Sequence, residues 1–130
     1  MKTLPILWQR LVSPEGRTCD RCQATHAQIS EAMAVLQRAL EPLGMVPVLE
    51  VGTLDRTSFA VAPSESNRIW IAGRPMEEWL GAGVGSSRCC SVCGESECRT
   101  VEVGGVSYET VPAQIIVKAA LLAAAQSMDA

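Results

Sequence analysis

Thr18-Cys19-Asp20-Arg21-Cys22 is the stretch that decides the fold, because it places a CxxC pair between an apolar strand and a long amphipathic helix. Backbone N–H groups in the first turn of a helix have no intrahelical acceptor, and the helix dipole is positive there. Both effects stabilise a thiolate, so we expect the pKa of the Cys19 thiol to be lowered. Cys19 and Cys22 are therefore the candidate catalytic residues.

The sequence around this pair predicts a strand, a helix and a second strand. Leu4 to Val12 is an apolar run that ends at a Ser-Pro-Glu-Gly turn. Met45 to Leu54 is rich in β-forming residues and predicts a second strand parallel to the first. Between them apolar residues recur every three or four positions up to a stop at Gly44, which indicates one helix face made of Cys22, His26, Ile29, Met33, Leu36, Leu40 and Leu43.

The middle of the chain predicts shorter elements. Asp55 to Asn67 reads as a short crossover, and Arg68 to Ala72 as a third strand. Pro75 opens a single helical turn, in which Glu77 and Glu78 are expected to face solvent.

Two further elements are expected near the end of the chain. Residues 81–98 are predicted to be a flexible Gly/Cys-rich loop, followed by a hairpin that turns at Gly104-Gly105 and contributes a strand to the sheet. The last helix, from Val111 to about Gln126, is apolar almost all round. It is therefore expected either to be buried on two sides or to pack against another subunit in a homodimer.

Composition limits the class of protein. The 130 residues predict one domain, 1–130, with a mainly aliphatic core, since 48% are hydrophobic and only 4% aromatic. A net charge of −3 without a basic cluster argues against a nucleic-acid partner. The most apolar run contains Lys118 and is shorter than the roughly 20 residues of a membrane span. No signal peptide is recognised, so a cytoplasmic location is expected, where six cysteines indicate ligands or redox thiols.

The order of these elements resembles the thioredoxin-like fold in its compact glutaredoxin-like form. That resemblance implies an α/β three-layer sandwich with a mixed sheet of about four strands, here with a cysteine-rich loop insertion. It also implies that Cys19 is the attacking thiol and Cys22 the resolving one. More closely, the CxxC, the segment from Ser66 to Pro75 and the Cys90-x-x-Cys93-Gly94 motif with Cys98-Arg99 are similar to those of an uncharacterised family of small bacterial cysteine-rich proteins.

One position departs from the thioredoxin pattern. Thioredoxins and glutaredoxins place a cis-proline just before the third strand, facing the CxxC, and Asn67 stands at that place here. In the family that proline orients the peptide bound for exchange and keeps metal ions off the dithiol. Asn67 is therefore the predicted substrate-facing residue, and its open face beside two thiolates suits a soft cation.

A second group of cysteines, Cys89, Cys90, Cys93 and Cys98, is the candidate metal site. Cys90-x-x-Cys93-Gly94 has the form of a metal knuckle. Three arrangements fit: zinc held within the loop by Cys89 or Cys90 together with Cys93 and Cys98; a mixed site in which the loop closes over Cys19 and Cys22; or a disulfide relay between the two groups.

His26 is the only histidine in the chain, so any mechanism that needs an imidazole must use it. It is the candidate fourth ligand of the mixed site. A single histidine on an apolar helix face is more often a hydrogen-bonded core residue, so burial is expected at this position.

Two functions use this same set of thiols. The first is a thiol-dependent redox protein that acts on a disulfide-bearing protein or a small thiophilic substrate. The second is a binding protein, without catalysis, for a soft metal or metalloid such as Zn²⁺, Cu⁺, Hg²⁺ or As(III). The position of Cys19 at a helix start narrowly favours the redox function over metal binding. A third possibility is a purely structural role, in which the cysteines only cross-link a loop.

Overall fold

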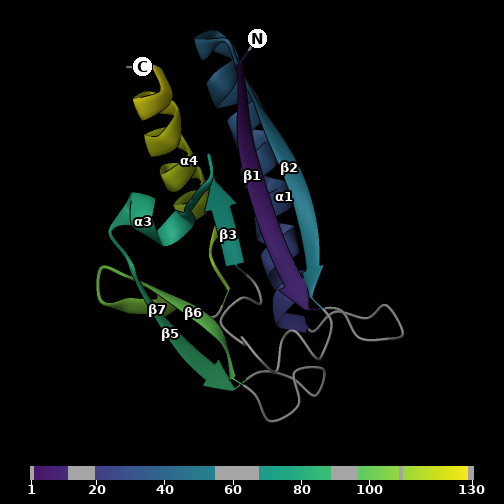
Figure 1. Ribbon diagram of the computed structural model, residues 1–130, viewed down its shortest axis with the longest axis vertical. Coiled ribbons are helices and arrows are strands. Elements are labelled where there is room, and N and C mark those ends of the chain that lie inside the picture. Colours follow the sequence, from purple (N-terminus) through teal and green to yellow (C-terminus); the bar gives the residue numbers. More distant parts are fainter. Residues whose placement is uncertain (1, 12–19, 55–67, 89–96, 109, 129–130) are drawn as a thin grey trace.

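The chain folds into an α/β structure with a large and a small β-sheet, seen in the computed structural model of Figure 1. The structure describes residues 2–11, 20–54, 68–88, 97–108 and 110–128, with side chains for 2–9, 24–52, 68–84, 100–108 and 110–128. Its elements are β1 (Lys2–Leu11), α1 (Asp20–Leu40), the 3-10 turn η1 (Glu41–Leu43), β2 (Met45–Leu54), β3 (Arg68–Ile71), β4 (Arg74–Pro75), α3 (Met76–Leu80), β5 (Gly83–Arg88), β6 (Glu97–Val103), β7 (Val106–Tyr108) and α4 (Ala113–Met128).

The larger sheet is mixed and has the strand order β2-β1-β3-β4. β1 and β2 are parallel, with Trp8 beside Val51, whereas β3 runs antiparallel to β1, with Trp8 beside Ile69. The parallel pair connected through α1 confirms the predicted strand–helix–strand unit, and the mixed four-stranded sheet confirms that part of the predicted fold.

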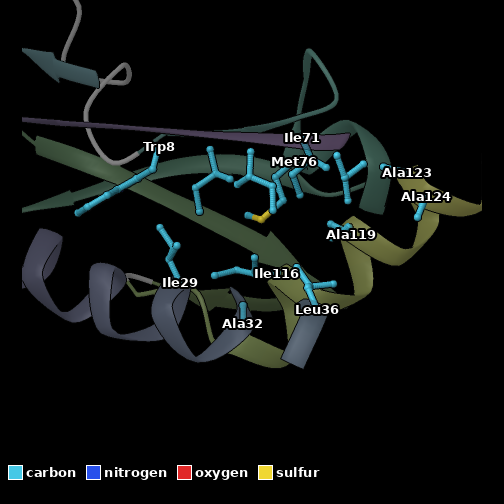
Figure 2. Packing of buried hydrophobic residues seen from close by; sticks show 14 of the residues in the cluster. Trp8, Ile29, Ala32, Leu36, Ile71, Met76, Ile116, Ala119, Ala123 and Ala124 are labelled. Carbon is cyan, nitrogen blue, oxygen red and sulfur yellow. The ribbon is translucent and has the colours of Figure 1, made fainter. Parts of the chain in front are cut away.

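One face of this sheet carries the core. Alternate β1 residues point to opposite faces, so Leu4, Ile6 and Trp8 are buried together while Thr3 and Pro5 are exposed. The three buried residues belong to one apolar cluster with Ile29 and Ile116 from the two long helices, and Figure 2 shows Trp8 on the side of this cluster that faces those helices. Since α1 and α4 cover the same face, the described residues form two layers, and the third layer of the predicted sandwich is not among them.

α1 ends as its sequence predicts. The helix passes into η1, and Gly44 adopts a left-handed conformation (φ 71°) while its N–H donates to the Glu41 carbonyl oxygen at 3.0 Å. A residue with a Cβ is strained at this φ, which is why a glycine supplies the stop.

The fourth strand of the larger sheet is not the predicted hairpin strand. Ala72 and Gly73 both have positive φ, 53° and 79°, and turn β4 back onto β3, where Arg74 pairs with Ile71. β4 is short because Pro75 lacks a backbone N–H and because α3 starts at the next residue. The edge position next to β3 is thereby taken before the chain reaches the hairpin.

The hairpin instead belongs to the smaller sheet, which has the order β5-β6-β7. Its turn confirms the prediction, since Gly104 and Gly105 both have positive φ. Residues 83–88 and 97–98 pair as strands, whereas they were expected in a flexible loop. The Gly- and Ser-rich sequence of β5 has little strand propensity of its own, and its pairing with β6 decides the conformation.

α4 has the predicted length but is shifted by about two residues, running from Ala113 to Met128, and its start is fixed by α1. The backbone N–H of Ala113 donates to the side-chain Oε1 of Gln28 at 2.8 Å, so a residue of one helix caps the other. None of the helices in the described ranges is both long and apolar enough to cross a membrane.

Candidate functional site

The start of α1 is the centre of the candidate site. The helix begins at Asp20, the residue after Cys19, and the backbone of Cys22 therefore lies in its first turn. Cys19 itself lies outside the described residues, as does the side chain of Cys22. The predicted location of the CxxC at a helix start following β1 is thus supported by the backbone, while the positions of the two sulfur atoms are not described.

His26 lies one helical turn after Cys22 and stacks on Trp8. The two ring centroids are 5.4 Å apart and the ring planes are inclined by only 6°. Trp8 is fully buried on the central strand β1, whereas His26 is exposed to solvent. The buried indole therefore supports one face of the imidazole and holds it at the surface near the start of α1.

The exposure of His26 corrects the expectation that it is a core residue. Among the side chains described in α1, those of residues 24–40, the buried stripe consists of Thr25, Ile29, Ala32, Leu36 and Leu40. This stripe is rotated from the predicted face, so His26 lies at its margin and stacks on the face of the Trp8 ring without entering the core. Cys22 stands in the same row as His26, four residues earlier, where side chains on a helix are neighbours.

The start of β3 lies beside the carboxyl-terminal part of β1. Arg68 pairs with Gln9, and its guanidinium lies over the Trp70 ring, 4.7 Å from the centroid. This contact places a positive charge directly after Asn67 in the chain. Asn67, the predicted substrate-facing residue, lies outside the described residues.

The second cysteine group is reached through the smaller sheet. Ser87 of β5 pairs with Cys98 of β6, and Arg88 pairs with Glu97. Cys89, Cys90 and Cys93 lie outside the described residues, and the side chain of Cys98 is not described either. The backbone therefore fixes only the two strand ends between which these cysteines occur in the sequence.

The described elements that flank the two cysteine groups meet at the same end of the molecule. In Figure 1 the first residues of α1, the last residues of β1 and β2, and the end of β5 all lie at the lower end of the long axis. Among the side chains that are described, no three His, Cys, Asp or Glu residues come together to hold a metal ion. Of the candidate ligands only His26 belongs to that set, so the predicted metal site stays a prediction.

Two features were not found from the sequence. Glu77 is buried, at 9% exposure, although it was expected to face solvent with Glu78. It is the second residue of α3, and Trp79 of the same helical turn donates its indole N–H to the Ile71 carbonyl oxygen at 2.7 Å, which draws this turn onto the sheet. The available sequence signal was the apolar residue Met76 directly before Glu77, and in the structure Met76 is 1% exposed.

The second feature is a groove of about 520 Å³ between α1 and α4. Its lining is largely apolar and lies well beyond the first turn of α1, so it is separate from the cysteine end. The sequence signal was a second, exposed row on α1, opposite the buried stripe: Glu31, Ala34, Val35 and Arg38.

Comparison with known proteins places the chain among relatives without a stated activity. Residues 4–120 match the sequence pattern of a family described as "Domain of unknown function (DUF2703)". A protein of the archaeon Archaeoglobus fulgidus, described as an uncharacterized protein, is 43% identical over 113 residues, which cover 87% of this chain and 82% of that protein. No solved structure matches the chain. The relative is archaeal, whereas the resemblance drawn from the motifs was to bacterial proteins.

Proposed function

Because the chain belongs to the family described as domain of unknown function DUF2703, whose description names no activity, we propose a function from the site itself. The protein is a thiol–disulfide exchange protein, with Cys19 as the attacking thiol and Cys22 as the resolving thiol. Its substrate is a disulfide-bearing protein or a small thiophilic molecule.

One observation carries this proposal: α1 begins at the residue after Cys19 and runs for 21 residues. A helix of this length has a full set of unpaired N–H groups and a developed dipole at its start. A thiol at that position gains stabilisation of its thiolate, which is the nucleophile in disulfide exchange. The succession β1, α1, β2, β3, β4 and α4, with β1 parallel to β2, also supports our proposal of a thioredoxin-like fold.

The reaction is a two-step exchange. The Cys19 thiolate attacks one sulfur of the substrate disulfide, forms a mixed disulfide and releases the other sulfur as a thiolate, which takes a proton. The Cys22 thiolate then attacks the sulfur of Cys19, forms the Cys19–Cys22 disulfide and releases the second substrate thiol. Two electrons pass to the substrate, and a low-molecular-weight thiol in excess returns the protein to its dithiol form.

His26 is the proposed proton carrier for these steps. It is exposed, it stands one turn from Cys22, and its ring is held by the stack on Trp8 at 5.4 Å. A neutral imidazole can accept the proton of a thiol, and an imidazolium can donate one to the leaving thiolate. The stack fixes the ring plane, so the imidazole needs no reordering between the two steps.

The test is exchange with a chromogenic aromatic disulfide, followed by intact-mass analysis. Cys19→Ser is expected to lower the rate by at least about 10³-fold, since the nucleophile is removed. Cys22→Ser is expected to react once and to remain as a mixed disulfide, because nothing resolves it. Cys98→Ser serves as the matched control. If Cys19 and Cys22 both stay reduced under mild oxidants, the proposal is wrong.

A second candidate function, binding of a soft metal or metalloid, is favoured by the shared position of the elements that flank the two cysteine groups. The start of α1, which includes the backbone of Cys22, and the start of β6, which includes that of Cys98 and pairs with the end of β5, lie toward the same end of the molecule in Figure 1. Thiolate ligands select Zn²⁺, Cu⁺ and related soft ions. The remaining candidate ligands are Cys19, Cys89, Cys90, Cys93 and His26.

Elemental analysis of protein purified without chelator tests this candidate. Stoichiometric metal that is lost in Cys93→Ser and in Cys98→Ser supports it, with Ser91→Ala as a control within the same motif. Protein that is free of metal and that also fails to bind added Zn²⁺ or As(III) excludes it.

A further inference from the structure

The exposed face of α1 has a symmetric pattern of charge. Glu31, Ala34, Val35 and Arg38 are all exposed and are spaced i, i+3, i+4 and i+7, so they form one row along the helix. The two apolar residues are at the centre and the opposite charges are at the ends. Val35 is 50% exposed, which leaves a branched apolar side chain half in water.

This row is one wall of the groove between α1 and α4. The other wall is formed by Ala113, Gln114 and Val117 of α4, and the groove has a volume of about 520 Å³. The bond from the Ala113 N–H to Gln28 Oε1 fixes the start of α4 against α1, so the walls are held in place.

The apolar surface continues along α4 beyond the groove. Leu121 and Leu122 are 38% and 43% exposed and line an adjoining hollow with Val117 and Lys118. α4 is buried on its other face, through Ile116, Ala119, Ala120, Ala123 and Ala124. The helix is thus covered on one side only, and the exposed leucines are joined to the α1 row through Val117.

We propose that this surface is covered by a second copy of the chain, with the two α1 helices crossing antiparallel at a two-fold axis. The midpoint of Glu31 and Arg38 falls between Ala34 and Val35. An axis at this midpoint sets Glu31 of one copy against Arg38 of the other, and by symmetry the reverse pair forms as well. Each copy therefore supplies the charge that the other needs.

The dimensions of the row agree with this arrangement. Glu31 and Arg38 are seven residues apart, or roughly 10.5 Å along a helix axis. Ala34 is small and lets the two helices approach, while Val35 enters the groove of the opposite copy beside Val117. A partner surface that is acidic throughout, or basic throughout, would meet a like charge at one end of the row. The row therefore favours a partner with one acidic and one basic end, and a second copy of the chain has such a surface.

Sedimentation of the full chain across about two decades of concentration, in a phosphine reductant, tests the proposal. The reductant removes intermolecular disulfides, so association through cysteines is not counted. Val35→Glu is expected to weaken association by at least about tenfold, because it buries a charge at the centre of the interface. Val106→Glu is the matched control, since Val106 is also 50% exposed but lies on β7.

Charge reversal gives the decisive result. Glu31→Arg and Arg38→Glu are each expected to weaken self-association by about tenfold or more, because each creates two like-charge pairs. Mixed together, the two variants are expected to form a heterodimer, and the double variant is expected to recover self-association. A monomeric wild-type chain at every concentration, no heterodimer on mixing, or equal loss in Val106→Glu would overturn the proposal. None of these variants touches Cys19 or Cys22, so the outcome is independent of the exchange assay.

Discussion

The two sheets of the molecule are stabilised in different ways. The four-stranded sheet carries a continuous apolar face, in which Leu4, Ile6 and Ile71 are at most 1% exposed. In the described part of the three-stranded sheet, Val101 is the one large apolar side chain that is buried, while Val84 and Val106 are 45% and 50% exposed. The larger sheet therefore has a core of its own, whereas the described side chains of the smaller sheet join that core through Val101, with Val103 partly buried against it.

The larger sheet therefore supplies most of the stability, while the smaller sheet carries part of the proposed thiol chemistry. A three-stranded sheet needs an apolar face or a covering helix for stability of its own, and the side chains described in the smaller sheet provide little of such a face. The same sheet carries Cys98 on β6 and leads into and out of residues 89–96. We expect the larger sheet to fold without any cysteine, and the smaller sheet to respond to the state of its thiols.

The largest expected effect is a cavity in the larger sheet. Ile6→Ala removes a fully packed side chain from the central strand and is expected to lower the free energy of unfolding by about 2–5 kcal/mol. Chemical denaturation measures it. Val48→Ala on the neighbouring strand is the control, since Val48 is 39% exposed and little burial is lost. Equal losses in both variants would mean that this sheet does not carry the core.

A smaller effect is expected where the two sheets join. Val101→Ala should lower the free energy of unfolding by about 1–3 kcal/mol, because two buried methyl groups are lost. Hydrogen exchange should locate the change: amides of β6 exchange faster, while those of β1 and β2 keep their protection. Uniform loss of protection over both sheets would contradict the proposed division.

The sequence predicted the elements whose signals are local. Gly44 ended the helix region, Gly104-Gly105 formed the hairpin turn, and β2 has the predicted limits, because turn geometry and apolar runs act over a few residues. β5 was missed because its Gly- and Ser-rich sequence forms a strand only through pairing with β6, which is a non-local effect. Strand order was misjudged for the same reason at β4.

The candidate site was predictable only in part. The CxxC could be placed at a helix start, since a strand, a turn and an amphipathic helix are all visible in the sequence. The exposure of His26 could not, because a small rotation of the buried stripe decides whether a residue at its margin is inside or outside. The stack on Trp8 brings together two residues from different elements, and no local pattern encodes it.

The third prediction concerns this stack, which lies at the cysteine end of the larger sheet. His26→Gln removes an aromatic pair and is expected to lower the free energy of unfolding by about 1 kcal/mol. His26→Phe keeps the stack and should restore most of that loss. If His26 carries the proton of the exchange reaction, both variants slow the exchange. His26→Phe is then expected to have near wild-type stability but a lowered exchange rate. Full exchange activity in His26→Phe would leave the imidazole with a structural role only.

The smallest effect is expected at the turn that completes the larger sheet, and its sign is opposite. Ala72 has a φ of 53°, a left-handed conformation that costs a residue with a Cβ about 1–2 kcal/mol, although its backbone N–H is well placed on the Pro5 carbonyl oxygen at 2.8 Å. Ala72→Gly relieves this strain but adds entropy to the unfolded chain, so a net gain of about 0.5–1 kcal/mol is expected.

Gly73→Ala at the next position tests the same reasoning in reverse. A Cβ at Gly73 would have no heavy atom within 4 Å apart from its immediate neighbours, so any loss must come from the backbone angle of 79° and not from a clash. A loss of about 1 kcal/mol is expected, with Ala72→Gly and Gly73→Ala shifting the denaturation midpoint in opposite directions. Ala72 and Gly73 are the two residues that connect β3 to β4. If both substitutions shifted the midpoint in the same direction, the pairing of β4 with β3, and not the turn, would set the conformation of Ala72.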